Sequence, residues 1–140
     1  MRSKLGGATN VAISSNGKWS VAMGCFENIQ GKPVNLARID LSTGKIIVLL
    51  AKGLEDVKGI ALSPDDKTIA LGFGSDEIKL WSVSDRKEMA SWKLRNFDGV
   101  RSLAYFNAGK RLAVTNRGGT KVIELEATTG QIVRTLWPEQ

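Results

Sequence analysis

The strongest constraint on the fold is a sequence unit that the chain contains three times. Each copy has a short apolar run, then a tight turn that ends in a lysine, then a second apolar run. The turn lysines are Lys18, Lys67 and Lys110, so successive copies lie 49 and 43 residues apart. Self-similarity at this period indicates a repeat architecture in which each copy folds as one supersecondary unit.

Each copy predicts four short strands. A turn such as Asn16-Gly17 separates the first two apolar runs, and the third run alternates, as in 78–81. A turn such as Thr43-Gly44 then leads to a fourth run, as in 46–50. No stretch has helical periodicity over three turns. We therefore predict an all-β fold of three four-stranded antiparallel units, at about residues 8–52, 56–95 and 99–137.

Length and composition fit one small globular domain over residues 1–140. Hydrophobic residues make up 42% and charged residues 24% of the chain, as in soluble proteins. The longest strongly apolar run, 46–51, is far too short to cross a membrane. The basic first residues precede no apolar core, and the single cysteine allows no intrachain disulfide. We expect a cytoplasmic protein without a signal peptide or membrane span.

The net charge of +6 raises the question of a nucleic-acid partner. The 20 lysines and arginines are scattered from Arg2 to Arg134, with no run longer than two. Nucleic-acid binding requires a clustered basic face. A nucleic-acid or polyanion-binding module is therefore the weaker interpretation, although the charge favours an acidic partner.

The sequence offers no convincing catalytic motif. It lacks histidine, the commonest general base and a common metal ligand. Two Ser-x-x-Lys matches, at 15–18 and 42–45, fall on predicted β-turns and not at a helix start. The acidic pairs at 55–56, 65–66 and 76–77 fall in predicted loops, where solvated carboxylates are expected. We expect no enzymatic activity, no cofactor and no metal.

The repeats resemble WD40-type β-propeller blades. The second copy matches best, with Ser63-Pro64-Asp65-Asp66-Lys67 at the family's turn and Ile78-Lys79-Leu80-Trp81-Ser82 at its third strand. The family's Gly-His element is missing and Ser82 replaces the aspartate of the Trp-Asp pair. The resemblance therefore implies blades without the family's buried Asp-His-Ser/Thr-Trp hydrogen-bond network. The turn at Thr43-Gly44-Lys45 is also similar to YVTN and quinoprotein-like propellers.

Three units are too few for a closed propeller, which typically has 4–8 blades. The chain is expected to be a segment of a longer propeller or to assemble with other copies, for example as a homodimer with six blades. The outer faces of the first and third units would otherwise expose large apolar surfaces, which soluble proteins seldom do.

The resemblance also implies where a partner would bind. Propellers bind through the loops of one rim and the starts of the innermost strands, where this chain has Thr9, Lys58 and Arg101. Arg117, after the second strand of the third unit, is expected near that rim. Because arginine pairs bidentately with carboxylates, these residues predict a basic lip that binds an acidic peptide segment.

A second candidate contact is the extra segment between the second and third strands of the first unit, from Cys25 to Val34. It places Phe26 and Ile29 in a predicted exposed loop, and exposed apolar residues favour contact with a partner. The alternative is that this loop packs against its own unit.

Together these observations predict a non-catalytic protein–protein interaction scaffold. One alternative is a segment of a quinoprotein-like or other enzymatic propeller whose active site needs further blades. The other is the polyanion-binding module considered above.

Overall fold

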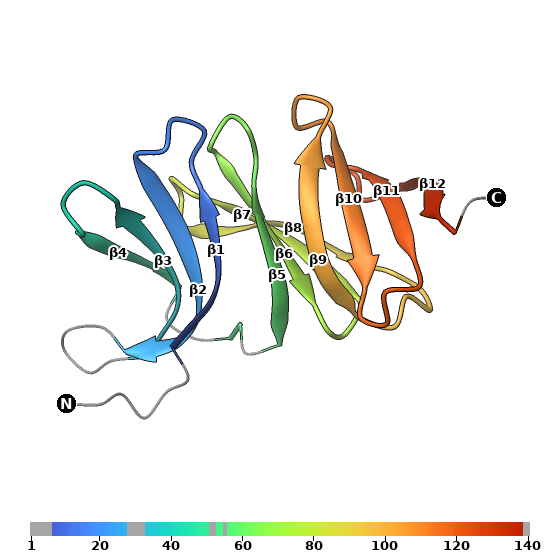
Figure 1. The fold of residues 1–140 in the computed structure, drawn as a ribbon, viewed down its shortest axis with the longest axis horizontal. Helices are drawn as coiled ribbons and strands as arrows, with labels where there is room; N and C mark the ends of the chain where they lie inside the picture. The colour runs from blue at the N-terminus through green and yellow to red at the C-terminus, as the bar shows by residue number, and fades with distance from the viewer. Residues whose placement is uncertain (1–6, 28–32, 51–52, 55, 139–140) are drawn as a thin grey trace. The chain divides into compact units, whose positions relative to one another are not determined.

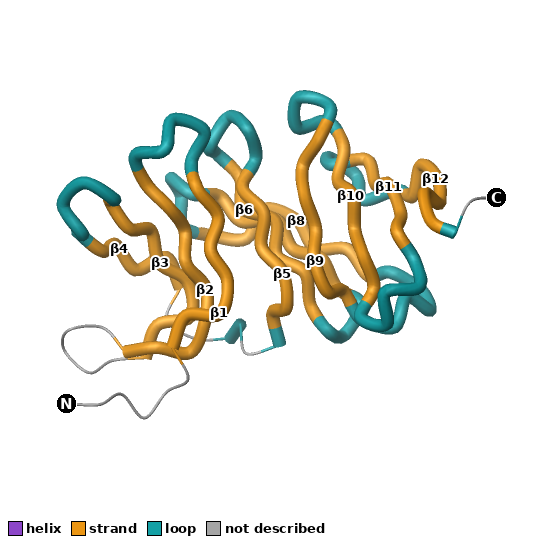
Figure 2. The backbone as a smooth tube through the Cα atoms, in the orientation of Figure 1, coloured by secondary structure: helices purple, strands orange, loops and turns teal. Residues whose placement is uncertain are grey.

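The computed structural model describes residues 7–27, 33–50, 53–54 and 56–138. All of its regular elements are β-strands, joined by turns and short loops (Figure 2). Within the described residues there is no helix that is long and apolar enough to cross a membrane. The prediction of an all-β fold is confirmed.

Within the described residues, twelve strands form three four-stranded antiparallel sheets (Figure 1). In each sheet, every strand pairs with its neighbours in sequence, as predicted for repeated antiparallel units. The first sheet holds β1 (Gly7–Ile13), β2 (Trp19–Glu27), β3 (Pro33–Asp40) and β4 (Ile46–Leu50). The second holds β5 (Val57–Leu62), β6 (Thr68–Phe73), β7 (Glu77–Ser82) and β8 (Lys87–Lys93). The third holds β9 (Val100–Phe106), β10 (Arg111–Asn116), β11 (Val122–Glu126) and β12 (Ile132–Trp137).

The turn between the first two strands of a sheet is fixed by a serine and an Asx residue in the first two copies. Ser14 donates its hydroxyl to Asn16 Oδ1 at 2.8 Å, and Ser63 donates its hydroxyl to Asp65 Oδ1. In each turn the same Asx oxygen also accepts the backbone N–H of the turn lysine. The third copy has Phe106-Asn107-Ala108 here and closes its turn with backbone hydrogen bonds alone.

The turn lysines have a second structural role, through their backbone. In every sheet the carbonyl of the turn lysine accepts the N–H of the residue that follows the third strand. These three pairs are Lys18–Leu41, Lys67–Val83 and Lys110–Ala127. The repeat found in the sequence is thus a repeat of hydrogen bonds that join the two turns at one end of each sheet.

The chain divides into two compact units, Met1–Glu55 and Asp56–Gln140. Unit 1 contains the first sheet, and unit 2 contains the second and third sheets. In unit 1, Val21 and Leu36 are fully buried on the central strands, whereas Val11, Ile13 and Ile46 are at least half exposed.

The core of unit 2 lies between its two sheets. Strands β5 and β9 lie next to each other, and one hydrophobic cluster takes residues from both sheets. The second sheet contributes Ala61, Ala70, Ile78 and Leu80, and the third contributes Val100, Leu103, Leu112, Val114, Ile123 and Leu125. Burial of this apolar area is the main stabilising contribution to the pair of sheets.

Glycine allows the two sheets to approach closely, most of all at Gly72 and Gly130. A Cβ added to Gly72 would lie 2.3 Å from Val100 Cγ1, and a Cβ added to Gly130 would lie 2.2 Å from Trp92 Cδ2. Both distances are far below van der Waals contact. The interface between the sheets therefore depends on the absence of a side chain at these positions.

The opposite face of the third sheet, which points away from the second sheet, is polar. Arg111 pairs with Glu124 and Glu126, and Arg134 pairs with the other oxygen of Glu124 at 3.0 Å. The register places Ala104, Ala113, Ser102 and Thr115 on the same face, together with three larger apolar residues, Phe106, Val122 and Trp137. We call this surface the charged face. The outer face of the third unit, expected from the sequence to be apolar, therefore carries a charged cluster together with the exposed side chains of Phe106 and Trp137.

Candidate functional site

The three inner-strand residues expected to contact a partner occupy one structural position. Thr9, Lys58 and Arg101 are each the residue skipped by the pairing register at the start of β1, β5 and β9. An extra residue of this kind forms a β-bulge, which re-aims a side chain. All three residues are exposed.

In unit 2 the two bulges are neighbours. A Cβ added to Gly59, next to Lys58, would lie 2.9 Å from the carbonyl oxygen of Arg101. The backbones of β5 and β9 are therefore in close contact at the positions of Lys58 and Arg101. We call this end of unit 2, with Lys58, Arg101 and Arg117, the bulge end.

Arg117 reaches the bulge end from the turn after β10. Its backbone N–H donates to the carbonyl of Gly99 at 2.9 Å, just before β9. Its guanidinium pairs with Asp98 at 2.9 Å, with both side chains more than half exposed. The structure thus brings Arg117 to the end predicted for it, but a neighbouring carboxylate balances its charge.

Asp76 organises the bulge end, although the sequence analysis assigned it to a solvated loop pair. Its carboxylate accepts the backbone N–H of Gly99 at 2.6 Å and of Phe97 at 3.3 Å. It therefore fixes the connection that leads into β9 and Arg101. The sequence signal that could have identified it is its place in the turn directly before the third strand.

The expected loss of the family's polar network is visible at Trp81. Its indole N–H is buried and, within the described residues, has no acceptor. The hydrogen bonds of Asp76 to two backbone amides remain, without any histidine. The segment that connects the second and third sheets is thus fixed by hydrogen bonds to the Asp76 carboxylate. The Trp81 side chain is fixed by packing.

The candidate contact in the first sheet falls largely outside the described residues. Ile29 lies in 28–32, which the structure does not describe. The prediction that Phe26 lies in a loop is wrong, because it belongs to β2 and pairs with Val34 of β3. Its side chain is outside the described part. Thr9 donates its hydroxyl to the carbonyl of Met23 at 3.3 Å, which ties the bulge of β1 to β2.

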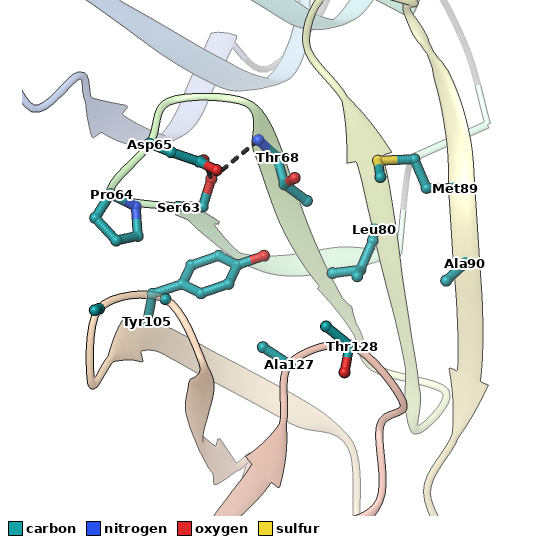
Figure 3. A pocket seen from close by; sticks show the side chains of 12 residues that line it. Ser63, Pro64, Asp65, Thr68, Leu80, Met89, Ala90, Tyr105, Ala127 and Thr128 are labelled. Atoms are coloured by element: carbon teal, nitrogen blue, oxygen red, sulfur yellow. Dashed lines mark hydrogen bonds between the residues drawn. The ribbon is translucent and has the colours of Figure 1, made fainter.

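A pocket of about 360 Å³ lies at the opposite end of unit 2, between its two sheets. We call this end the turn end, because the first-to-second-strand turns of both sheets border it. Tyr105 of β9 reaches from the third sheet into the pocket, towards the second sheet (Figure 3). Leu80, Ala90 and Ala127 form apolar walls. This pocket could not be predicted from the sequence, because small residues on separate strands leave the space for it.

Two ionisable groups in the pocket have shifted pKa values. Burial raises the pKa of the Tyr105 phenol, and the charge of Asp65 raises it further. The hydroxyl of Ser63 and the backbone N–H of Lys67 lower the pKa of Asp65. At neutral pH the pocket therefore holds a neutral phenol and an ionised carboxylate.

Among the described residues, no group of three or more histidine, cysteine, aspartate or glutamate side chains is placed to hold a metal ion. The ion pairs of unit 2 pair carboxylates with arginine or lysine. Among the described residues, the bulge end and the pocket at the turn end both offer chemistry for recognition.

Comparison with known proteins supports the fold and no finer identity. No family model matches the sequence, and no curated protein matches it. Solved structures do match, among them the WD40 repeats of RRP9, with a TM-score of 0.72 at 18% identity over 98% of this chain. U3-55K matches with a TM-score of 0.73 at 19% identity over 98% of this chain. The hydrazine synthase of Kuenenia stuttgartiensis matches with a TM-score of 0.68 at 16% identity over 96%.

The chain spans 40%, 41% and 37% of these three chains, in the same order. Three successive four-stranded sheets, the shared turn hydrogen bonds and these structural matches agree with one another. The chain therefore has the fold of WD40-type β-propeller blades.

Proposed function

We propose that the chain is a non-catalytic protein-interaction scaffold that binds an acidic segment of a partner protein at the bulge end. The observation that carries this proposal is the shared bulge position of Lys58 and Arg101 on adjacent strands. Two exposed cations on closely spaced backbones favour a carboxylate-rich segment. Arg117 contributes less, because Asp98 already neutralises it.

Asp76 supports the same proposal through preorganisation. By holding the backbone of Phe97 and Gly99, it limits the freedom of the segment that leads to Arg101. A preorganised site loses less conformational entropy on binding. Thr9 occupies the equivalent bulge in unit 1 and would offer a hydroxyl where unit 2 offers cations.

Charge reversal tests this function. We expect Lys58→Glu and Arg101→Glu together to weaken binding of a fluorescein-labelled poly-glutamate peptide by about tenfold, measured by anisotropy in low salt. The matched control is Lys87→Glu with Lys110→Glu, which removes two exposed lysines outside the bulge end. Equal loss in both pairs would mean that net charge alone governs binding, and would remove the bulge end as the site.

An enzymatic propeller segment is the second candidate, and the likeness to part of a hydrazine synthase is the observation that favours it. This function would need groups supplied by further blades. The absorption spectrum of the protein purified from its own source distinguishes the two proposals. A visible band from a tightly bound cofactor would favour the enzyme.

We also propose that the three sheets form part of a larger propeller. The chain spans 40% of the RRP9 structure, and Val11 and Ile13 in the first sheet are 62% and 53% exposed. Light scattering separates the two ways to complete the ring. A mass of twice 15.2 kDa would favour a second copy, and a single 15.2 kDa chain would favour further blades of one polypeptide.

A further inference from the structure

The pocket at the turn end has a lining that is rich in hydrogen-bond acceptors. Asp65 is the only charged residue among the twelve that line it. Hydroxyl groups of Ser63, Thr68, Tyr105 and Thr128 complete the polar part of the lining. The remaining lining residues are apolar or glycine, so a cation with an apolar stem matches this surface.

We propose that this pocket binds a basic side chain, lysine or arginine, of a partner polypeptide. Its aliphatic stem would lie against Leu80 and Ala127, which are both buried. Its cationic group would lie beside Asp65 and the hydroxyl of Tyr105. Long basic side chains pack their stems on apolar surface while the charged group stays near solvent.

The polar groups are available for such a ligand. Among the described residues, no hydrogen bond involves the hydroxyl of Tyr105 or that of Thr68. Asp65 accepts hydrogen bonds from Ser63 and from the N–H of Lys67 at one oxygen, Oδ1. Neither of these two bonds uses its second oxygen. A charge-assisted hydrogen bond to this carboxylate is the strongest interaction the pocket can offer.

Tyr105 of the third sheet and Asp65 of the second sheet line the same pocket from opposite sides. The charge of Asp65 contributes to the raised pKa of Tyr105, so the carboxylate and the phenol are electrostatically coupled. A cation between them would be stabilised by the carboxylate, by the hydroxyl and by the ring face. The positive charge of Lys67 also acts on Asp65, so a bound cation must compete with it.

The first sheet supplies a control that is built into the chain. Asn16 occupies the position of Asp65 and makes the same two hydrogen bonds, with the hydroxyl of Ser14 and the N–H of Lys18. Asp65→Asn therefore removes the charge and keeps the turn. Asp66→Asn removes the same charge one residue further on, outside the pocket lining.

The experiment is an amide chemical-shift titration of the full chain with short capped peptides. The probes are acetyl-Ala-Lys-Ala-amide, acetyl-Ala-Arg-Ala-amide and the norleucine analogue, which has the stem without the charge. We expect saturable shifts at residue 63, residues 65–68, residue 105 and residues 127–128 with both basic peptides. We expect about tenfold weaker binding to Asp65→Asn, a smaller loss for Tyr105→Phe, and unchanged binding to Asp66→Asn.

Three results would each overturn the proposal. They are no saturable shift with either basic peptide, equal binding of the norleucine peptide, and an unchanged affinity of Asp65→Asn. This site lies at the turn end and takes a cation, so its failure would leave the acidic-segment site at the bulge end untouched. Stronger binding of the basic peptides to Lys67→Gln would add support, because it removes the competing charge.

Discussion

The second and third sheets present the same strand positions to very different surroundings. In the second sheet, Ala61, Ala70, Leu80 and Ala90 are cross-strand neighbours, and they pack into the core of unit 2. In the third sheet, the matching residues are Ala104, Ala113, Glu124 and Arg134. The inner two strands keep alanine, whereas the outer two change from apolar to charged.

The difference shows how one repeat can serve as an interface or as a surface. Gly72 in the second sheet, where Val100 packs, corresponds to Thr115 in the third, where the hydroxyl meets Ser102 at 2.7 Å. Thr68 likewise corresponds to Arg111, which pairs with Glu124 and Glu126. The charged face satisfies its own polar groups, as expected for a repeat whose face meets water or a polar neighbour.

Exchanging Leu80 and Glu124, the equivalent residues that differ most between the two sheets, should have the largest effect on the free energy of unfolding. Leu80→Glu would bury a carboxylate without a partner and should cost about 4 kcal/mol of unfolding free energy. Glu124→Leu should change stability by only about 1 kcal/mol, because Arg111 keeps Glu126 and Arg134 is largely exposed. Urea unfolding followed by circular dichroism measures both. Similar losses in the two variants would show that the two faces have similar surroundings.

The glycine-to-threonine difference predicts a somewhat smaller effect. Gly72→Thr should destabilise the chain by about 3 kcal/mol, because the new side chain overlaps Val100 and Leu103. The reverse change, Thr115→Gly, should cost about 1 kcal/mol from strand propensity and the lost hydroxyl contact. The same unfolding experiment compares them. A cost below 1 kcal/mol for Gly72→Thr would contradict the close packing of the two sheets.

Two glycines with the same φ angle allow a further comparison, between a turn that faces a neighbouring sheet and one that does not. Gly44 and Gly130 both have φ of +75° in equivalent turns, but only Gly130 faces a neighbour, Trp92. Gly44→Ala should cost about 1 kcal/mol from the left-handed backbone alone. Gly130→Ala should cost about 2 kcal/mol, since it adds the overlap with Trp92. Thermal unfolding that ranks the two variants in the opposite order would argue against the contact.

The smallest effect concerns the turn after the third strand. Asp40, which occupies the position of Glu126, accepts hydrogen bonds from the hydroxyl of Ser42 and from the N–H groups of Thr43 and Ser42. These bonds lower its pKa from 3.8 to about 2. Its contribution to stability is therefore present above pH 3.8 and is lost as the pH falls towards 2.

Asp40→Asn should flatten the acid limb of the stability curve in this window, as measured by urea unfolding at a series of pH values. Asp85→Asn, in the equivalent turn of the second sheet, is the control for the loss of one carboxylate. An identical curve for Asp40→Asn and the unchanged chain would contradict a contribution of the ionised Asp40 carboxylate to stability.

Much of the fold could be predicted from the sequence because turns and strand periodicity are local. The three turn lysines and the alternation in 78–81 indicate the sheets directly. The polar face of the third sheet has a weaker signal, the alternation of Glu124 with Glu126. Whether such a face is buried depends on a neighbouring sheet, so one repeat cannot decide it.

The candidate sites also differ in whether a local sequence signal predicts them. Lys58 and Arg101 could be proposed because inner-strand starts follow from the repeat, and their role as contacts stays a prediction. The role of Asp76 depends on backbone amides more than twenty residues away in the sequence. The pocket depends on small residues from several strands, such as Ala90 and Ala127, whose meeting requires the packed sheets.

The footprint of an acidic peptide on the chain tests the proposed function most directly. Amide chemical shifts of the full chain, titrated with the poly-glutamate peptide, should move at Lys58, Arg101 and Arg117. They should stay unchanged on the charged face, for example at Ala113 and Glu124. Shifts concentrated on the charged face, with none at the bulges of β5 and β9, would contradict the assignment of the bulge end as the binding site.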